Sequence, residues 1–305
     1  MDARRARRAV RPPRCGGFSL VELIVVIVVA GIVATVVAGV IVRPTEGYID
    51  LSRRAGLVDA AEAALQRLAR DIRRALPNSI RVSGGNVIEM ISVADAARYR
   101  DDPPPGDPDK RLELTQADEE FNALGLLNNL SFAIPDCPAT VARSDLRLVV
   151  YHTGDAGADA YADDPVITPA GRQLDFCTDT GLAASDDEHH IRIAAPGHRF
   201  TLESPAQRIY AVDTPVTYHC DDATANDVVR FWDYPIQDPQ LTSRGALQGE
   251  PGVREALLTE HVTGCRFTYQ PGTSQRAGLV TLEIELSNAS ETITLLHQVH
   301  VGNAP

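Results

Sequence analysis

One uninterrupted apolar run near the N-terminus limits what this chain can fold into. Residues 23–42 are 20 consecutive uncharged residues, mostly β-branched or small. As an α-helix they would extend about 30 Å, which matches the hydrocarbon core of a bilayer. The run therefore predicts a transmembrane helix, to which the rest of the 305-residue chain is attached.

Charge is unevenly placed around this run. Residues 1–17 contain six Arg and one Asp, whereas only Arg43, Arg53 and Arg54 follow shortly after the run. Because the more basic flank of a transmembrane helix stays in the cytoplasm, we expect the residues after 43 to face outward. The whole chain carries −12 and its first 17 residues +5, so the rest carries −17. Such an acidic body argues against nucleic-acid binding.

Two ordinary interpretations of the run leave features unexplained. A secretory signal peptide has about 7–15 apolar residues and then a small-residue cleavage site. Here the run is longer, and the sequence that follows it is Arg43-Pro44-Thr45-Glu46. A plain signal anchor accounts for length and orientation, but not for Gly16-Gly17-Phe18 or for Glu22. A carboxylate in an apolar helix costs about 2.5–3.5 kcal/mol on insertion scales, so Glu22 is a candidate functional residue.

The stretch GGFSLVEL, residues 16–23, resembles the class III signal of type IV pilins and type II secretion pseudopilins. The resemblance implies that a prepilin peptidase cuts between Gly17 and Phe18 and that Phe18 is then N-methylated. Glu22 would become the fifth mature residue. It would neutralise the new amine of a neighbouring subunit, removing two buried charges together. In this interpretation Glu22 is an assembly residue that sets subunit register in a filament.

A second helical pattern follows the apolar run. Pro44 and Gly47 predict a kink or a melted turn between the two halves, and Pro77 predicts the end of the helix. In the outer half, apolar residues recur mostly three or four apart and form one stripe: Leu51, Val58, Ala61, Leu65, Leu68, Ile72 and Leu76. The arginines on the other faces are interpreted as a solvated surface, with contacts to neighbouring subunits as the alternative.

Beyond Pro77 the pattern becomes typical of strands. We expect a hairpin over 79–93, a strand in 145–154, a second hairpin over 207–236 and a three-stranded meander over 261–301. Thr115 and Asp118 predict the N-cap of a short helix ending near Asn129. The fold class is α+β, a long N-terminal helix packed on a mainly antiparallel β domain, which is also the pilin plan. The predicted boundaries are 1–17 (leader), 18–42 (transmembrane half), 43–77 (amphipathic half) and 78–305 (β domain).

The chain has five cysteines: Cys15, Cys137, Cys177, Cys220 and Cys265. Removal of the leader leaves four, an even number that suits disulfides outside the cytoplasm. Among the three possible connectivities we favour Cys137–Cys177 and Cys220–Cys265. The second pair joins the end of one predicted strand to the interior of another, whereas the first rests only on nearness in sequence. Four buried free thiols are the alternative.

Three polar clusters are possible metal sites, but none has the ligand spacing of a known site. Asp155, Asp159, Asp163 and Asp164 lack the alternate spacing of a calcium-binding EF-hand, so they are interpreted as solvated loop acids. His297 and His300 would lie on opposite faces of a strand. Residues 187–190, Asp-Glu-His-His, precede a strand as a polar cluster. No catalytic motif is present, and we expect neither an enzyme nor a cofactor or metal.

Three functions remain open from the sequence. Residues 43–82, 216–236 and 295–305 resemble the MshO-type minor pilin-like proteins of the mannose-sensitive haemagglutinin pilus system. A J-type minor pseudopilin of type II secretion is the first alternative. A pilus-borne adhesin or sugar-binding module is the second, favoured if Trp232 and Tyr234 line an exposed groove.

The resemblance also implies partners and a location. The partners are the prepilin peptidase, other major and minor pilin-like subunits, the inner-membrane assembly platform and membrane lipid, but not nucleic acid. The implied location is the inner membrane, crossed once, with the N-terminus cytoplasmic and the C-terminal domain periplasmic. Incorporation at a pilus tip is left open.

Overall fold

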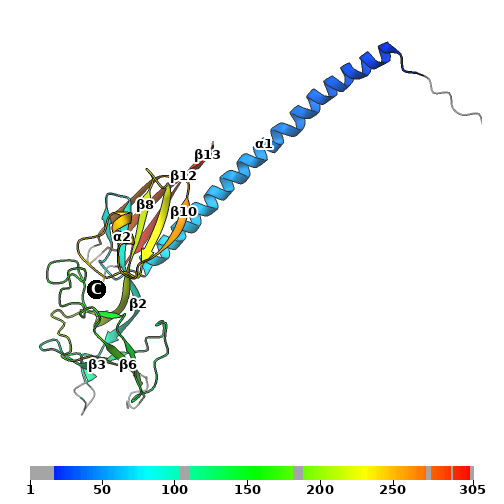
Figure 1. Cartoon of the computed structure of the whole chain (residues 1–305). Helices are drawn as coiled ribbons and strands as arrows, with labels where there is room; N and C mark the ends of the chain where they lie inside the picture. Colours follow the sequence, from blue (N-terminus) through cyan, green and yellow to red (C-terminus); the bar gives the residue numbers. More distant parts are fainter. Residues whose placement is uncertain are drawn as a thin grey trace, which may run out of the picture. The chain divides into compact units, whose positions relative to one another are not determined.

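The computed structural model describes residues 17–103, 107, 110–180, 188–272, 276–289 and 291–302 (Figure 1). For residues 41–46 only the backbone is described. The leader up to residue 16, with Cys15, and Asp187 of the polar cluster lie outside the described residues. The chain divides into two compact units between Arg53 and Arg54, and each unit is described by itself.

The secondary structure consists of two helices and thirteen strands within the described residues. The elements in chain order are α1 (Leu20–Arg73), β1 (Arg81–Ser83), β2 (Val87–Tyr99), β3 (Glu120–Leu124), β4 (Val141–Arg143), β5 (Arg147–Val149), β6 (Leu174–Asp179), β7 (Glu188–Ile193), β8 (Arg208–Asp221), β9 (Asp227–Trp232), α2 (Arg244–Gln248), β10 (Arg254–Glu260), β11 (Val262–Gln270), β12 (Gly278–Asn288) and β13 (Glu291–Val301).

Helix α1 runs for 54 residues without interruption through Pro44 and Gly47. The predicted melted turn is therefore wrong. Proline removes one backbone donor and disfavours the preceding turn, but the helix continues through Pro44. The helix ends at Arg73, before Pro77, because the following residues pair with β2: Leu76 N–H donates to Ile91 O at 2.8 Å, and Val93 N–H donates to Arg74 O at 3.0 Å.

Ten of the described strands form one sheet, with the order β10-β9-β8-β2-β3-β7-β6-β4, and with β1 paired to β2 and β5 to β8. The pairings between these strands are antiparallel. The predicted β1–β2 hairpin turns at Gly84 and Gly85, whose φ angles are +62° and +78°. Glycine is suited to two consecutive positive φ angles because it has no Cβ. The predicted β8–β9 hairpin is also present.

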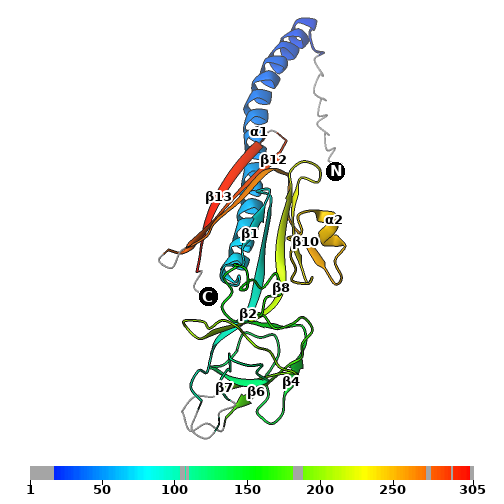
Figure 2. The ribbon, with the colours of Figure 1, turned by 90° about the vertical axis from the view of Figure 1, so that its left-hand side faces the viewer.

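The amphipathic stripe of α1 packs into the main hydrophobic core. Its buried members include Ala61, Leu65, Leu68 and Ile72, whereas the predicted Val58 is only partly buried and its neighbour Leu57 is buried instead. Leu51, predicted to belong to the same stripe, is 70% exposed. The core also takes side chains from β2, β8, β9 and the meander β11-β12-β13, and β12 and β13 lie across α1 in Figure 2.

A polar anchor joins α1 to the sheet beside this core. Asp71 of α1 accepts a hydrogen bond from the Tyr218 hydroxyl and another from Arg230 Nε, both at 2.7 Å. Arg230 is mostly buried, so the pair is less screened than a surface ion pair. The contacts fix the outer end of the helix against β8 and β9.

A second core lies where β2 and β8 meet β3, β6 and β7, with Tyr99, Phe121, Phe176 and Phe200 completely buried. The helix predicted to begin near Thr115 is absent; β3 occupies its place. Asp118 does act as a local cap, but of a turn: its carboxylate accepts from Glu113 N–H at 2.7 Å and from Glu120 N–H at 3.2 Å. Strand pairing with β2 and β7 then overrides the helical signal.

The predicted α+β class is confirmed: an N-terminal apolar helix is followed by a mainly antiparallel β domain with few helices, in a pilin-like arrangement. The C-terminal meander was also predicted correctly as β11-β12-β13. The strand expected within 145–154 is shorter, β5.

Candidate functional site

The candidate processing segment lies immediately before α1. Gly17, Phe18 and Ser19 have no regular secondary structure, and helix α1 begins at Leu20. Gly17 and Phe18 are both exposed, Phe18 by 79%. A peptidase requires an accessible, non-helical bond, and the Gly17–Phe18 bond meets both requirements within the described residues.

Ser19 caps the helix that carries Glu22. The Ser19 hydroxyl accepts a hydrogen bond from the backbone N–H of Glu22 at 3.2 Å, and the Ser19 carbonyl accepts from Leu23 N–H at 3.1 Å. Ser19 and Glu22 are three residues apart, the spacing of a capping box. The sequence interpretation missed this role of Ser19, although the S-x-x-E pattern is the signal that could have revealed it.

Glu22 lies in the first turn of α1 and is exposed. A carboxylate there interacts favourably with the positive end of the helix dipole. The Glu22 carboxylate can therefore stabilise the start of α1 and also pair with a positive charge on a partner. Leu20–Val40 is a helical stretch long and apolar enough to cross a membrane, and none of it is buried inside the protein.

A family model decides what this segment is. The prokaryotic N-terminal methylation motif matches residues 12–38. The match contains Gly17, Phe18 and Glu22 and supports a type IV pilin-like protein. No curated protein and no solved structure gives a significant match to the chain. The pilin-like motif implies processing by prepilin peptidase and assembly with other pilins, and it suggests a membrane-anchored structural subunit rather than an enzyme.

Two disulfides are formed in the β domain. Cys137 is joined to Cys177 and Cys220 to Cys265, with Cα–Cα distances of 5.1 Å and 6.7 Å. These are the pairs favoured from the sequence. The second bond links β8 to β11 and so ties the large sheet to the C-terminal meander.

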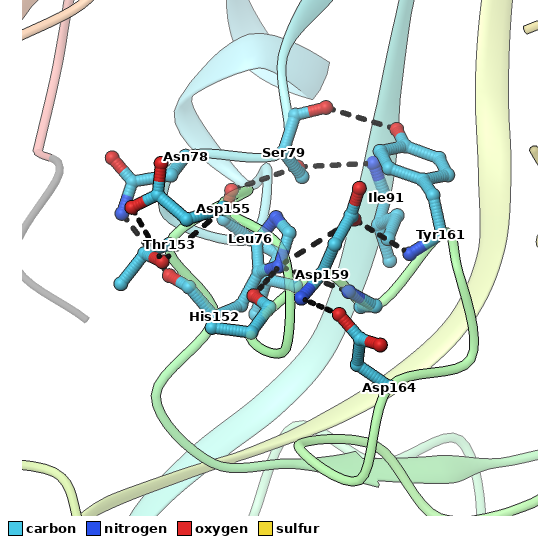
Figure 3. A network of polar contacts seen from close by, with 12 residues as sticks. Leu76, Asn78, Ser79, Ile91, His152, Thr153, Asp155, Asp159, Tyr161 and Asp164 are labelled. Atoms are coloured by element: carbon cyan, nitrogen blue, oxygen red, sulfur yellow. Dashed lines mark hydrogen bonds and ion pairs between the residues drawn. The ribbon is translucent and has the colours of Figure 1, made fainter. Parts of the chain in front are cut away.

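Hydrogen bonds organise the acidic loop after β5 (Figure 3). Asp159 N–H donates to an Asp164 oxygen, and Tyr161 N–H donates to an Asp159 oxygen, both at 2.9 Å. Asp155 contacts Thr153, and Asp163 forms an ion pair with Arg147. Within the described residues no cluster of three or more His, Cys, Asp or Glu side chains could hold a metal ion.

His152 is the buried centre of this loop. Its Nδ1 lies 3.1 Å from both Ala160 N and the Ala158 carbonyl oxygen, and Nε2 has no hydrogen-bond partner within the described residues. Burial lowers the pKa of the imidazole, and the nearby Asp159 carboxylate opposes that shift.

The same loop is hydrogen-bonded to the residues that follow α1. The Tyr161 hydroxyl donates to Ser79 O at 2.9 Å, and Asn78 Nδ2 donates to His152 O at 3.1 Å (Figure 3). The Ser79 hydroxyl in turn donates to Leu76 O and accepts from Ile91 N–H. The loop thus holds the chain where it passes from helix to sheet.

A buried ion pair lies beside this junction. Glu89 is 1% exposed; it accepts from Arg81 Nε at 2.8 Å and from the Tyr234 hydroxyl at 3.0 Å. Burial raises the pKa of Glu89, while Arg81 acts in the opposite direction. The Arg81 guanidinium also stacks 3.6 Å from the centre of the Tyr161 ring. Sequence reasoning did not identify this cluster: Arg81 and Glu89 face each other across the predicted hairpin, but Tyr161 and Tyr234 are far from them along the chain.

The aromatic pair considered for an adhesin does not line an exposed groove. Tyr234 is 4% exposed, and its hydroxyl is used by Glu89 and Thr217. Trp232 is partly buried against the main core and stacks with Arg230 and Arg254. These contacts give both rings a structural role.

The histidines considered for metal binding have separate surroundings. His297 faces the core side of β13 and His300 the exposed side, as the alternating burial of the strand shows. His189 accepts from Leu127 N–H, whereas the neighbouring His190 contacts Asn122 and Glu120. Neither pair converges on a common point.

Proposed function

We propose that this chain is a minor pilin-like subunit that takes part in assembly or priming of a type IV pilus of the haemagglutinin type. The observation that carries the proposal is the class III signal, with an accessible Gly17–Phe18 bond directly before a helix that carries Glu22. The resemblance of residues 43–82, 216–236 and 295–305 to MshO-type proteins supports the haemagglutinin-type assignment.

In this proposal the prepilin peptidase removes residues 1–17, and Phe18 is N-methylated. Residues 18–42 stay in the inner membrane, 43–77 form the amphipathic half of the helix, and 78–305 form the periplasmic β domain. The Arg-rich leader favours a cytoplasmic N-terminus. The assembly platform, membrane lipid and other pilin-like subunits are the partners, and a position at the pilus tip is compatible with a minor subunit.

Glu22 acts in assembly by neutralising a charge. Cleavage gives Phe18 a positive amine at the start of an apolar helix. An isolated charge in hydrocarbon is costly, and an opposite charge from a neighbouring subunit compensates it. Because the rest of the apolar helix offers only non-directional packing, this contact gives the filament its register.

A matched pair of substitutions tests the proposal. Glu22→Gln removes the charge and keeps the shape, and Glu62→Gln makes the same change on the exposed face of α1 in the β-domain unit. Co-purification of other pilin-like subunits from membranes should fall for Glu22→Gln and stay unchanged for Glu62→Gln. Equal association of both variants would contradict the neutralisation.

The J-type pseudopilin remains the second candidate because it shares the same N-terminal signal. Deletion of the chain distinguishes the two: loss of surface pili supports the proposal, and loss of secreted enzymes with pili retained favours the pseudopilin. The adhesin or sugar-binding alternative is disfavoured by the buried Tyr234 and the stacked Trp232.

A further inference from the structure

Two long strands of the β domain have an outer edge that is unpaired within the described residues. β10 is the last strand at one end of the ten-stranded sheet, and β13 is the last strand of the three-stranded meander. The other ends are short or covered. β4 has three residues, and β11 meets the β1–β2 turn, where Phe267 N–H donates to Gly85 O at 2.7 Å. Figure 2 shows β13 on the left of the β domain and β10 on the right.

These two edges run in opposite directions. β10 ends beside the β8–β9 turn, where Glu260 pairs with Asp227. β11 begins at the same end of the domain, where Val262 N–H donates to Asn226 O at 2.9 Å. Because β11 and β13 are both antiparallel to β12, β13 also runs away from this end.

β13 runs in the same direction as residues 54–73 of α1. Glu291, at its start, lies 3.9 Å from Arg54, and Gly302, directly after its end, lines a cavity with Arg73 and Arg74. β10 therefore runs against the helix. If a second copy stands beside the first with its helix in the same direction, the β10 edge of one copy is antiparallel to the β13 edge of the other. Two such edges can form a regular hydrogen-bond ladder.

Each free edge carries an exposed leucine on the same side of the β domain. Among the described residues after α1, the large apolar side chains that stay exposed are Leu126, Leu257 of β10 and Leu296 of β13, and the last two are 54% and 59% exposed. Leu257 pairs with Val229, which packs under α2, and Leu296 alternates with Leu295, which packs against the main core. Leu257 and Leu296 thus both point away from the main core.

β13 lacks the features that usually prevent edge strands from pairing, which are bulges, prolines and charged side chains. Its 11 residues pair with β12 in unbroken register and include no Lys, Arg or Pro. Glu291, at its start, is its one acidic residue, so the charged residues of β10 meet no like charge along the rest of the strand. β10 has a bulge, but it follows Leu257 and leaves residues 254–257 regular.

We propose that the β13 edge of this chain pairs with the β10 edge of a second copy, antiparallel and with Leu296 opposite Leu257. This pairing rests on the proposed function, since it takes the helices of assembled subunits to run in the same direction. It covers both leucines and places Gln298 opposite Glu255, whose carboxylate can accept from the amide. Two different edges meet, so each pair keeps one free edge of each kind, to which further subunits can be added.

Disulfide trapping of the full chain in membranes tests the register. One tagged copy carries Leu257→Cys and a differently tagged copy Leu296→Cys, both with Cys15→Ser, because the other four cysteines are already paired. Opposite residues of antiparallel strands have Cβ atoms about 4.5–5.5 Å apart, so mild oxidation should link the two copies. The control Thr268→Cys is exposed on β11, two strands and about 9.6 Å from β13, and should give at least about tenfold less product with Leu257→Cys.

A charge placed on the edge gives a second test at a neighbouring pair. Glu255→Cys and Gln298→Cys should also link the two copies. Adding Leu296→Lys to the second copy should lower that yield about fivefold, the upper range for one cross-strand pair. Thr268→Lys adds the same charge away from the edge and should leave the yield unchanged. Circular dichroism confirms that the variants are folded, as expected for substitutions of exposed side chains.

Three outcomes would contradict the pairing. The first is equal linkage of Leu257→Cys to Thr268→Cys and to Leu296→Cys. The second is an excess of Leu296→Cys homodimers, which would show that β13 pairs with itself. The third is no linked product; if Leu296→Lys then also reduces co-purification of other pilin-like subunits, the edge belongs to a different subunit. The mass of the chain from the same membranes keeps the two proposals apart, because a chain that begins at Phe18 but does not link rejects only the edge pairing.

Discussion

The hydroxyl of Ser19 and the backbone N–H of Glu22 are 3.2 Å apart, so the residue proposed to direct assembly lies in a turn that its own neighbour caps. The acid and the cap occupy the same first turn of α1. A substitution of Ser19 therefore changes the capping of the turn that carries Glu22 without changing the charge of Glu22.

Ser19→Ala should loosen the start of α1. Loss of a serine N-cap costs about 1 kcal/mol, which corresponds to roughly fivefold faster hydrogen exchange at the capped amide. The measurement is exchange at the Glu22 amide of the full chain in micelles. Ser19→Thr keeps the acceptor and should exchange nearly as slowly as the wild type; equal rates in all three proteins would exclude a capping role.

Arg81→Met should destabilise the β domain by about 3 kcal/mol, because it leaves the buried Glu89 carboxylate without its cation. The double variant Arg81→Met/Glu89→Gln should recover much of that loss, since no uncompensated charge remains. Chemical denaturation of the full chain measures both. A double variant as unstable as the single one would show that packing on Tyr161, rather than charge, is what Arg81 provides.

The lowered pKa of His152 predicts that the folded chain loses stability as the pH falls. Its pKa is lowered in the folded chain, so below the unfolded pKa of about 6.5 the unfolded state takes up a proton that the folded state resists. The contribution is fully present above that pH and falls as the pH drops. His189, His198 and His219 also have lowered pKa values, so the comparison must be with a variant.

The variant for this comparison is His152→Asn, which keeps a polar side chain and does not titrate. Between pH 7.5 and 5.5 it should lose less stability than the wild type, although it is less stable at the higher pH. Thermal unfolding at both pH values measures the difference. Identical losses of stability in the two proteins would show that His152 does not contribute to the pH dependence of unfolding.

The two disulfides should be found by non-reducing peptide mapping as Cys137–Cys177 and Cys220–Cys265. Their sequence separations are 40 and 45 residues, and a closed loop of that size stabilises by about 4 kcal/mol in the chain-entropy model. Free thiols in protein isolated from its native membrane would contradict both the pairing and an oxidising location for the β domain.

The parts of the fold that were predicted correctly have local causes. The helical stripe around Leu65 and Leu68, the glycine turn at Gly84 and Gly85, and the alternating pattern of β12 are each set by residues close together in sequence. The processing segment was recognised for the same reason: Gly17, Phe18 and Glu22 belong to one short motif.

The parts that were missed depend on contacts between distant residues. Thr115 and Asp118 predicted the N-cap of a helix, but pairing of β3 with β2 and β7 makes the following segment a strand. Glu89 meets Tyr234 across 145 positions, and Tyr161 meets Ser79 across 82. No local sequence pattern predicts such contacts, because they form only when the sheet brings the distant segments together.

The most direct test of the central claim is the mass of the mature chain purified from native membranes. Cleavage by a prepilin peptidase predicts an N-terminal peptide that begins at methylated Phe18, with residues 1–17 lost, and Gly17→Ala should slow or prevent this processing. A mature protein that keeps Met1, or one that begins beyond Val42, would contradict the pilin-like account.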